Sequence, residues 1–204
     1  MAKLLGSKIL SPIQLNMNNL LKTKAFVFII AILFSFQMKG QVADNKGIVI
    51  LKNKKSLAEI LASKELKGKV VYGDMWGANC KPCIEELRNY TPALKEQYAN
   101  NDNLVFLYVS INFNKKVLDK WKELIVSQKM TGYHLSIENL EDYRVIFNQV
   151  VGSKDNEVAI PRYFIADGLG NIVVRNAKKP SDTTRLYSQI DSVMAMLPSS
   201  LHKK

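Results

Sequence analysis

The chain has 204 residues, of which 47% are hydrophobic and 23% are charged. This length and composition predict one globular domain with a sizeable core and exclude a disordered chain. The formal net charge is +11, but the first forty residues hold five lysines and no acid, so the remainder is only mildly basic. Because no Lys- and Arg-rich block with interleaved aromatic residues stands out there, we expect no nucleic-acid partner.

An apolar run of twelve residues, interrupted by one serine, occupies residues 25–36, and Lys22 and Lys24 precede it. A charged segment, a short apolar segment and a polar segment in this order are typical of an export signal. A membrane-spanning helix needs about 20 apolar residues, so we expect cleavage after Gly40 rather than a permanent anchor. We therefore expect a protein of the periplasm or cell envelope, tethered to the membrane if the segment stays uncleaved.

The chain divides into a targeting segment and one domain. A start at Met17 would give a signal of conventional length, which makes residues 1–16 a candidate for a wrongly assigned leader. The expected segments are a signal peptide at 1–40, a linker at 41–47, a domain at 48–198 and a polar tail at 199–204.

Hydrophobic periodicity predicts strands in alternation with helices. The expected strands, in chain order, lie at 48–51, 69–75, 104–111, 133–137, 159–166 and 172–174. The expected helices lie at 56–62, after Cys80, at 115–128, at 140–151 and from 180 onward. This order is typical of an α/β fold with a mixed central sheet flanked by helices, and the hairpin at 167–171 adds an antiparallel edge.

Four local expectations can be checked against a structure. Gly68 is expected to end the first helix, and Pro92 to kink the helix after Cys80. The alternation at 133–137 predicts a strand with one solvated face, on which His134 is expected to lie.

The only two cysteines, Cys80 and Cys83, are spaced Cys-x-x-Cys where a strand meets a helix. Unpaired backbone N–H groups and the helix dipole favour a thiolate at Cys80, and Lys81 adds a neighbouring cation. Pro82 suits the first helical turn because its missing N–H is not needed there. We expect Cys80 to be exposed and to attack a disulfide, and the shielded Cys83 to resolve the mixed disulfide.

Asp74 lies on the entering strand, six residues before Cys80, among apolar neighbours. A buried carboxyl has a raised pKa, which suits Asp74 to accept the proton of Cys83. The alternative is that Asp74 is a plain residue at the end of a strand.

Two other interpretations of the cysteine pair are weaker. A structural disulfide that closes a four-residue loop constrains the unfolded chain little. A zinc site lacks its second half, because His134 and His202 are the only histidines. We therefore expect no metal and no cofactor other than a redox-active disulfide. Trp76 and Trp121 are expected to pack in the core, with Trp76 flanking the site.

A proline opens the apolar strand at 159–166, away from any obvious sheet edge. Because proline cannot donate a hydrogen bond to a central strand, its position needs an explanation. A cis peptide bond between Ile160 and Pro161 is one.

With Trp76-x-x-x-Cys80-x-x-Cys83 and the later Ile160-Pro161, the chain resembles the thioredoxin superfamily, in particular its exported TlpA/ResA-type thiol–disulfide oxidoreductases. The resemblance covers about residues 48–197. An additional strand–helix unit at 133–151 and the sequence from Ile160 to Asp167, followed by a glycine turn, are typical of this group. The resemblance implies a three-layer thioredoxin-like fold with a strand–helix insertion before the cis-proline strand.

The resemblance also implies roles for single residues. Pro161 would be cis and pack against the cysteines, the backbone of Ile160 would pair with a substrate, and Asp74 matches the family's buried acid. The expected substrate-binding residues are Trp76, Asn79, Lys81, Pro82, Ile160 and Pro161. The family usually has tryptophan where this chain has Asn79, and its helix proline usually falls about one turn earlier than Pro92.

The leading functional hypothesis is an exported dithiol reductase of disulfide-bearing proteins that receives electrons from a membrane thiol–disulfide donor. A disulfide oxidant or isomerase remains an alternative, because reduction potential sets the direction of exchange. A redox-dependent binding module that does not turn over is the alternative outside enzymes.

Overall fold

The computed structural model describes residues 47–52, 56–152 and 159–198, all within one compact unit of the chain, residues 43–204. The expected signal peptide, most of the expected linker and the expected tail lie outside the described residues. None of the helices in the described part of the chain has the length and hydropathy needed to cross a bilayer.

A six-stranded sheet forms the centre of the fold, in the order β1-β4-β3-β2-β5-β6. The strands are β1 (Ile48–Ile50), β2 (Val70–Trp76), β3 (Leu104–Ile111), β4 (Gly132–Ile137), β5 (Arg162–Ala166) and β6 (Ile172–Val174). The first four strands of this order run parallel, whereas β5 and β6 are antiparallel to their neighbours. The expected mixed sheet with a hairpin at one edge is confirmed.

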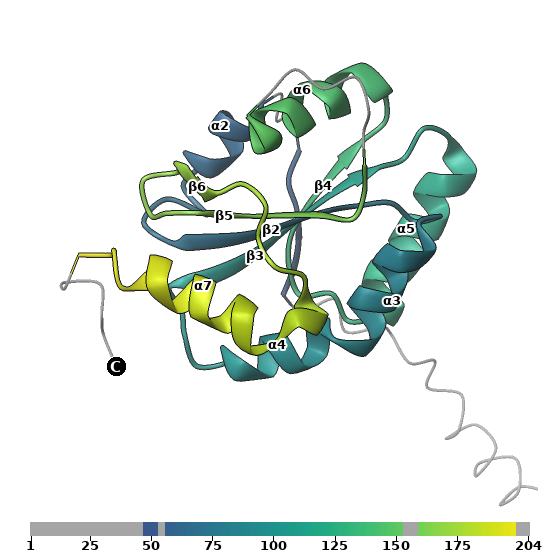
Figure 1. Ribbon diagram of the computed structural model, residues 1–204. Helices are drawn as coiled ribbons and strands as arrows, with labels where there is room; N and C mark the ends of the chain where they lie inside the picture. Colours follow the sequence, from purple (N-terminus) through teal and green to yellow (C-terminus); the bar gives the residue numbers. More distant parts are fainter. Residues whose placement is uncertain (1–46, 53–55, 153–158, 199–204) are drawn as a thin grey trace, which may run out of the picture. The chain divides into compact units, whose positions relative to one another are not determined.

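Helices cover both faces of the sheet, which makes three layers (Figure 1). On one face lie α2 (Leu57–Leu61) and α6 (Leu140–Val151). On the other lie α3 (Lys81–Asn89), α4 (Thr91–Gln97), α5 (Lys115–Ser127) and α7 (Thr184–Met194), the last preceded by the 3-10 turn η1 (Pro180–Asp182). The thioredoxin-like architecture is confirmed, with β4 and α6 as the additional strand–helix unit.

Strand β2 is buried along its whole length because it has a neighbour on each side and helices on both faces. Val71 and Met75 point into the core under α2 and α6, whereas Tyr72 and Trp76 point toward the helices of the other face. Since side chains alternate along a strand, Asp74 lies on the same face as Tyr72 and Trp76. This is the face that carries the helix with the cysteines.

Two helix boundaries differ from expectation. Pro92 does not kink one long helix: α3 ends at Asn89 and a separate α4 begins at Thr91, with proline in its first turn. The proline ring would clash with the carbonyl group four residues earlier, and proline has no N–H to donate to it. Helix α3 therefore ends before Pro92, and a new helix begins with Pro92 in its first turn. Gly68 does not end the first helix, because α2 already ends at Leu61.

The expectation for β4 is wrong. His134 is fully buried rather than solvated, and Leu135 on the opposite face of the strand is buried as well. The reason is tertiary: side chains of α5 and β3 pack against His134 and cover this face of the strand. The His134 ring stacks on Tyr108 and meets Trp121 of α5 edge-on.

Candidate active site

The cysteine pair lies where β2 ends and α3 begins. The chain turns after Trp76, and the N–H of Cys80 donates to the carbonyl oxygen of Gly77 at 2.9 Å. Cys80 is the N-cap of α3, and its Sγ accepts a hydrogen bond from the N–H of Cys83 at 3.2 Å. Proline in the first turn presets the helical backbone without removing a needed donor. The local sequence therefore places the Cys80 sulfur at the N-terminus of α3.

Cys80 and Cys83 form a disulfide with a Cα–Cα distance of 5.3 Å. Cys80 is partly exposed, whereas Cys83 is only 1% exposed. Only one of the two sulfurs is therefore open to a partner molecule, as expected from the spacing of the motif.

Pairing of β5 with β2 brings the Ile160-Pro161 bond to the cysteines. The two strands are antiparallel, and Arg162 at the start of β5 is in register with Met75 near the end of β2. The Ile160-Pro161 peptide bond is cis. The Ile160 carbonyl oxygen lies 3.9 Å from Cys80 Sγ. Two segments 80 residues apart in the sequence thus form opposite walls of one site.

Asp74 is 3% exposed and lies between Tyr108 of β3 and Tyr163 of β5 in the sheet register. Its Oδ1 has no hydrogen-bond partner among the described residues. Burial raises the pKa of Asp74 well above its ordinary value, and the nearby charge of Glu86 raises it further. A carboxyl of this kind can exchange a proton under conditions in which an exposed aspartate stays ionised.

Glu86 is a buried acid that the sequence analysis missed. It lies one turn after Cys83 on α3 and is 6% exposed. It accepts hydrogen bonds from the Ser181 N–H at 2.9 Å and the Ser181 hydroxyl at 2.8 Å, and Lys179 Nζ lies 3.2 Å away. The signal was available, because Cys83, Glu86 and Leu87 share one helix face at i, i+3 and i+4.

The other expected site residues differ in exposure. Asn79, Lys81 and Pro82 are exposed around the disulfide, and Asn79 Oδ1 accepts a hydrogen bond from Lys120 of α5 at 2.9 Å. Trp76 is fully buried in the core beneath the site. Its expected packing in the core is confirmed, and its contact with a substrate stays a prediction.

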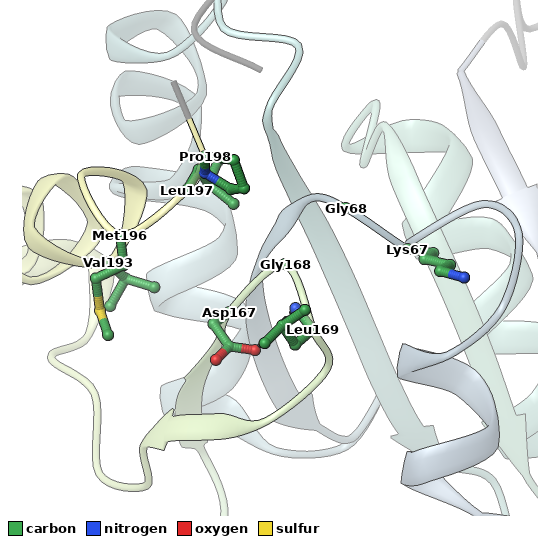
Figure 2. A pocket seen from close by; sticks show the side chains of 9 residues that line it. All are labelled: Lys67, Gly68, Asp167, Gly168, Leu169, Val193, Met196, Leu197 and Pro198. Atoms are coloured by element: carbon green, nitrogen blue, oxygen red, sulfur yellow. Dashed lines mark hydrogen bonds between the residues drawn. The ribbon is translucent and has the colours of Figure 1, made fainter. Parts of the chain in front are cut away.

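Within the described ranges, no group of three or more His, Cys, Asp or Glu side chains could hold a metal ion. A mainly apolar cavity of about 380 Å³ lies between the β5–β6 turn and the end of α7, next to Leu169 and Met196 (Figure 2). Gly68, which lines it, precedes β2, whereas Cys80 follows β2. The cavity therefore lies at the opposite end of the sheet and takes no part in the disulfide site.

A thioredoxin-like fold with a Cys-x-x-Cys disulfide at a helix N-terminus and a cis-proline beside it defines a thiol–disulfide oxidoreductase of the thioredoxin superfamily. The chain belongs to the redoxin family, whose model matches residues 41–193. No curated protein matches the chain.

Three solved structures have a chain similar to this one. A Bacteroides vulgatus protein assigned as a thiol–disulfide oxidoreductase is 27% identical, with 64% of this chain and 77% of that chain covered and a TM-score of 0.49. A thioredoxin-like protein from Porphyromonas gingivalis is 26% identical, with 64% and 76% covered and a TM-score of 0.44. A thiol–disulfide oxidoreductase from Bacteroides fragilis is 14% identical, with 63% and 87% covered and a TM-score of 0.47.

The raised pKa of Asp74 predicts how stability depends on pH. Between the ordinary and the raised pKa, the folded protein keeps a proton that the unfolded chain has released, so stability falls as pH rises through this window. Asp74→Asn removes this loss. We expect thermal unfolding of the oxidised variant to occur at higher temperature than in the unmodified protein, by about 2–4 °C per kcal/mol gained, with a gain that grows with pH.

Thermal unfolding between pH 4 and pH 8 measures this effect. Asp102→Asn is the matched control, because it makes the same substitution in an exposed turn. A gain at Asp74 that is equal at every pH would contradict the interpretation.

Proposed function

We propose that the protein is an exported dithiol reductase that reduces disulfide bonds in partner proteins. The observation that carries this proposal is an exposed sulfur and a buried sulfur on the face of the sheet that also carries a buried acid. Cys80 is open to a partner, Cys83 is closed to solvent, and Asp74 is buried on the face of β2 that α3 covers. This arrangement supports a two-step exchange in which one cysteine attacks and the other resolves.

In the first step, the Cys80 thiolate of the reduced protein attacks one sulfur of the partner disulfide. The partner's S–S bond breaks, a mixed disulfide with Cys80 forms, and the departing sulfur takes a proton from water. The Cys83 N–H, 3.2 Å from Cys80 Sγ, stabilises the negative charge before attack. The N-terminus of α3 acts in the same sense.

In the second step, the Cys83 thiol gives its proton to the Asp74 carboxylate, and the resulting thiolate attacks Cys80 Sγ. The mixed disulfide breaks and the Cys80–Cys83 disulfide forms, while the departing partner sulfur takes a proton from water. The partner leaves with two thiols and two more electrons than it brought. The raised pKa of Asp74 favours this transfer, because a stronger base takes the proton more readily.

Each turnover leaves the protein oxidised, so a dithiol must reduce the Cys80–Cys83 disulfide again. We assign this role to a membrane thiol–disulfide donor, because an exported protein works where disulfides persist. In the return reaction, the departing Cys83 thiolate takes the proton back from Asp74, so the same pair of groups serves both directions.

The exposed rim of the site suits an extended partner segment. The Ile160 carbonyl oxygen points to within 3.9 Å of Cys80 Sγ, so a partner strand held by the backbone of Ile160 would carry its disulfide to the attacking sulfur. Asn79, Lys81 and Pro82 are exposed on the other side of Cys80 and would meet the same segment.

Loss of either cysteine separates the two steps. Cys80→Ser should lower insulin-disulfide reduction by the mature protein, with dithiothreitol as donor, to the rate of dithiothreitol alone, because no attacking thiolate remains. Cys83→Ala should trap partner proteins as mixed disulfides on Cys80, visible on non-reducing gels and released by reductant. Unchanged insulin reduction by Cys80→Ser would sink the proposal.

The direction of exchange follows from the reduction potential. A reductase should equilibrate with glutathione near the reducing end of the family range of about −270 to −120 mV. A value near the oxidising end would favour the oxidant or isomerase alternative. Partner capture that survives loss of both cysteines would favour the binding module.

Export is proposed from the apolar run at 25–36, which lies outside the described residues. We expect the protein recovered from the cell envelope to begin at Gln41, as N-terminal sequencing would show. Sequencing of a cleavage-blocked precursor would tell a start at Met1 from a start at Met17. A recovered protein that retains residues 25–36 would instead be membrane-tethered.

A further inference from the structure

A row of four polar side chains crosses the sheet beneath the helices that carry the cysteines. Asp74 of β2 is in register with Tyr163 of β5 on one side and with Tyr108 of β3 on the other. Tyr108 is in turn in register with His134 of β4. Registered neighbours point to the same face of a sheet, so the four side chains lie side by side. Each is at most 4% exposed.

Each member of this row has a buried polar atom without a hydrogen-bond partner among the described residues. These atoms are Asp74 Oδ1, Tyr108 OH, Tyr163 OH and His134 Nδ1. Buried polar atoms are rarely left unpaired in folded proteins, and internal water is their usual partner where protein groups are not in reach. Four such atoms in one row are therefore best satisfied by internal water between the strands and the helices.

At neutral pH the row contains both a hydrogen-bond acceptor and a hydrogen-bond donor. His134 Nε2 lies 2.6 Å from the Met130 carbonyl oxygen, so Nε2 carries the hydrogen and Nδ1 is an acceptor. Burial lowers the pKa of His134 to about 4, so the ring is neutral at pH 7. Burial raises the pKa of Tyr108, whose hydroxyl therefore stays protonated and can donate.

The ring of Tyr108 is held by two neighbouring side chains. Its ring stacks on His134 at a centroid distance of 4.8 Å, and Lys95 Nζ lies 5.3 Å from its centre. The ring also belongs to the core cluster that contains Trp76 and Cys83. A hydroxyl on a ring fixed in this way has a defined place on the face of the sheet that carries Asp74 and that α3 covers.

We propose that Tyr108 is a positioning residue of the disulfide exchange, whose hydroxyl holds an internal water that donates a hydrogen bond to the Asp74 carboxylate. The water stabilises the ionised carboxylate and keeps it in place to take the Cys83 proton. The Cys83 S–H bond breaks and an Asp74 O–H bond forms, while Tyr108 keeps its own proton throughout. The inference rests on the proposed function only for this transfer, because the hydrogen bond to Asp74 exists in the oxidised protein without turnover.

Other groups also act on Asp74 and must be held constant in a test. The groups that interact electrostatically with it are Tyr72 on β2, Tyr108 on β3, Tyr163 on β5, Glu86 on α3 and Tyr143 on α6. Tyr143 offers a matched control. It is buried and its hydroxyl has no partner among the described residues, but it belongs to the core on the opposite face of the sheet.

Tyr108→Phe removes the hydroxyl and keeps the ring. Carbon-13 NMR of the Asp74 carboxyl in the oxidised protein should show a higher pKa than in the unmodified protein, because the ionised form loses a hydrogen bond. Tyr143→Phe should change that pKa less than Tyr108→Phe does, because Tyr143 packs in the core on the opposite face of the sheet. An unchanged value in Tyr108→Phe, or an equal rise in both variants, would overturn the proposal whether or not the protein proves to be a reductase.

The kinetic consequence is measured on the reduced protein with 5,5′-dithiobis(2-nitrobenzoate). Release of the second thionitrobenzoate reports the attack of Cys83 on the mixed disulfide. We expect Tyr108→Phe to slow this release by about tenfold at pH values below the pKa of Asp74, because a rise of about one pKa unit leaves about a tenth of the carboxylate ionised. The slowing should shrink at higher pH, and the first release should be unchanged. Equal slowing in Tyr143→Phe would show a general packing effect and would count against a role for Tyr108.

A measurement on the unmodified protein covers the case in which Tyr108→Phe does not fold. An internal water bound to the hydroxyl should give a nuclear Overhauser effect between the water protons and the Tyr108 hydroxyl proton. The sign of this effect should be the one that marks a long-lived, slowly moving water. Absence of long-lived water at this position would overturn the inference.

Discussion

Pairing of β2 with a parallel neighbour on one side and an antiparallel neighbour on the other is the constraint on which the site depends. The parallel partner, β3, buries the strand and places Tyr108 next to Asp74. The antiparallel partner, β5, runs back toward the cysteines, so its beginning meets the end of β2 and brings Ile160 to Cys80. If β2 lacked β3, Asp74 would be exposed to water at the edge of the sheet. If β2 lacked β5, Ile160 would not lie beside Cys80.

The two buried acids near the cysteines have opposite surroundings, and this contrast sets their chemistry. Glu86 has two hydrogen bonds from Ser181 and an ammonium group from Lys179, which together compensate the loss of water around its charge. Asp74 lacks such partners at Oδ1, and burial therefore raises its pKa. One carboxylate thus ties α3 to the turn before α7, while the other stays buried with a raised pKa.

Sequence reasoning identified the parts of the site whose signals are local. The cysteine spacing, the first-turn proline and the buried strand before Cys80 are all contained within about fifteen residues, and each predicts one feature of the backbone or of its charge. It failed where burial depends on distant partners. His134 alternates with apolar residues as a residue on a solvated strand face would, but Trp121 of α5 covers that face. Glu86 carries a charge that usually indicates solvent, but Ser181 and Lys179 come to it from 95 and 93 residues away.

The sequence by itself determined the chemical class of the protein, because a Cys-x-x-Cys pair at a strand–helix junction sets the form of the reaction within one helical turn. It also determined the order of strands and helices, since hydrophobic periodicity is a local property of the chain. Only the tertiary structure decided which groups surround the pair: Glu86 with its partners, the row from Tyr163 to His134, and the exposure of Asn79 against the burial of Trp76. These depend on strand register and on helix packing, which join residues far apart in the chain and leave no local pattern.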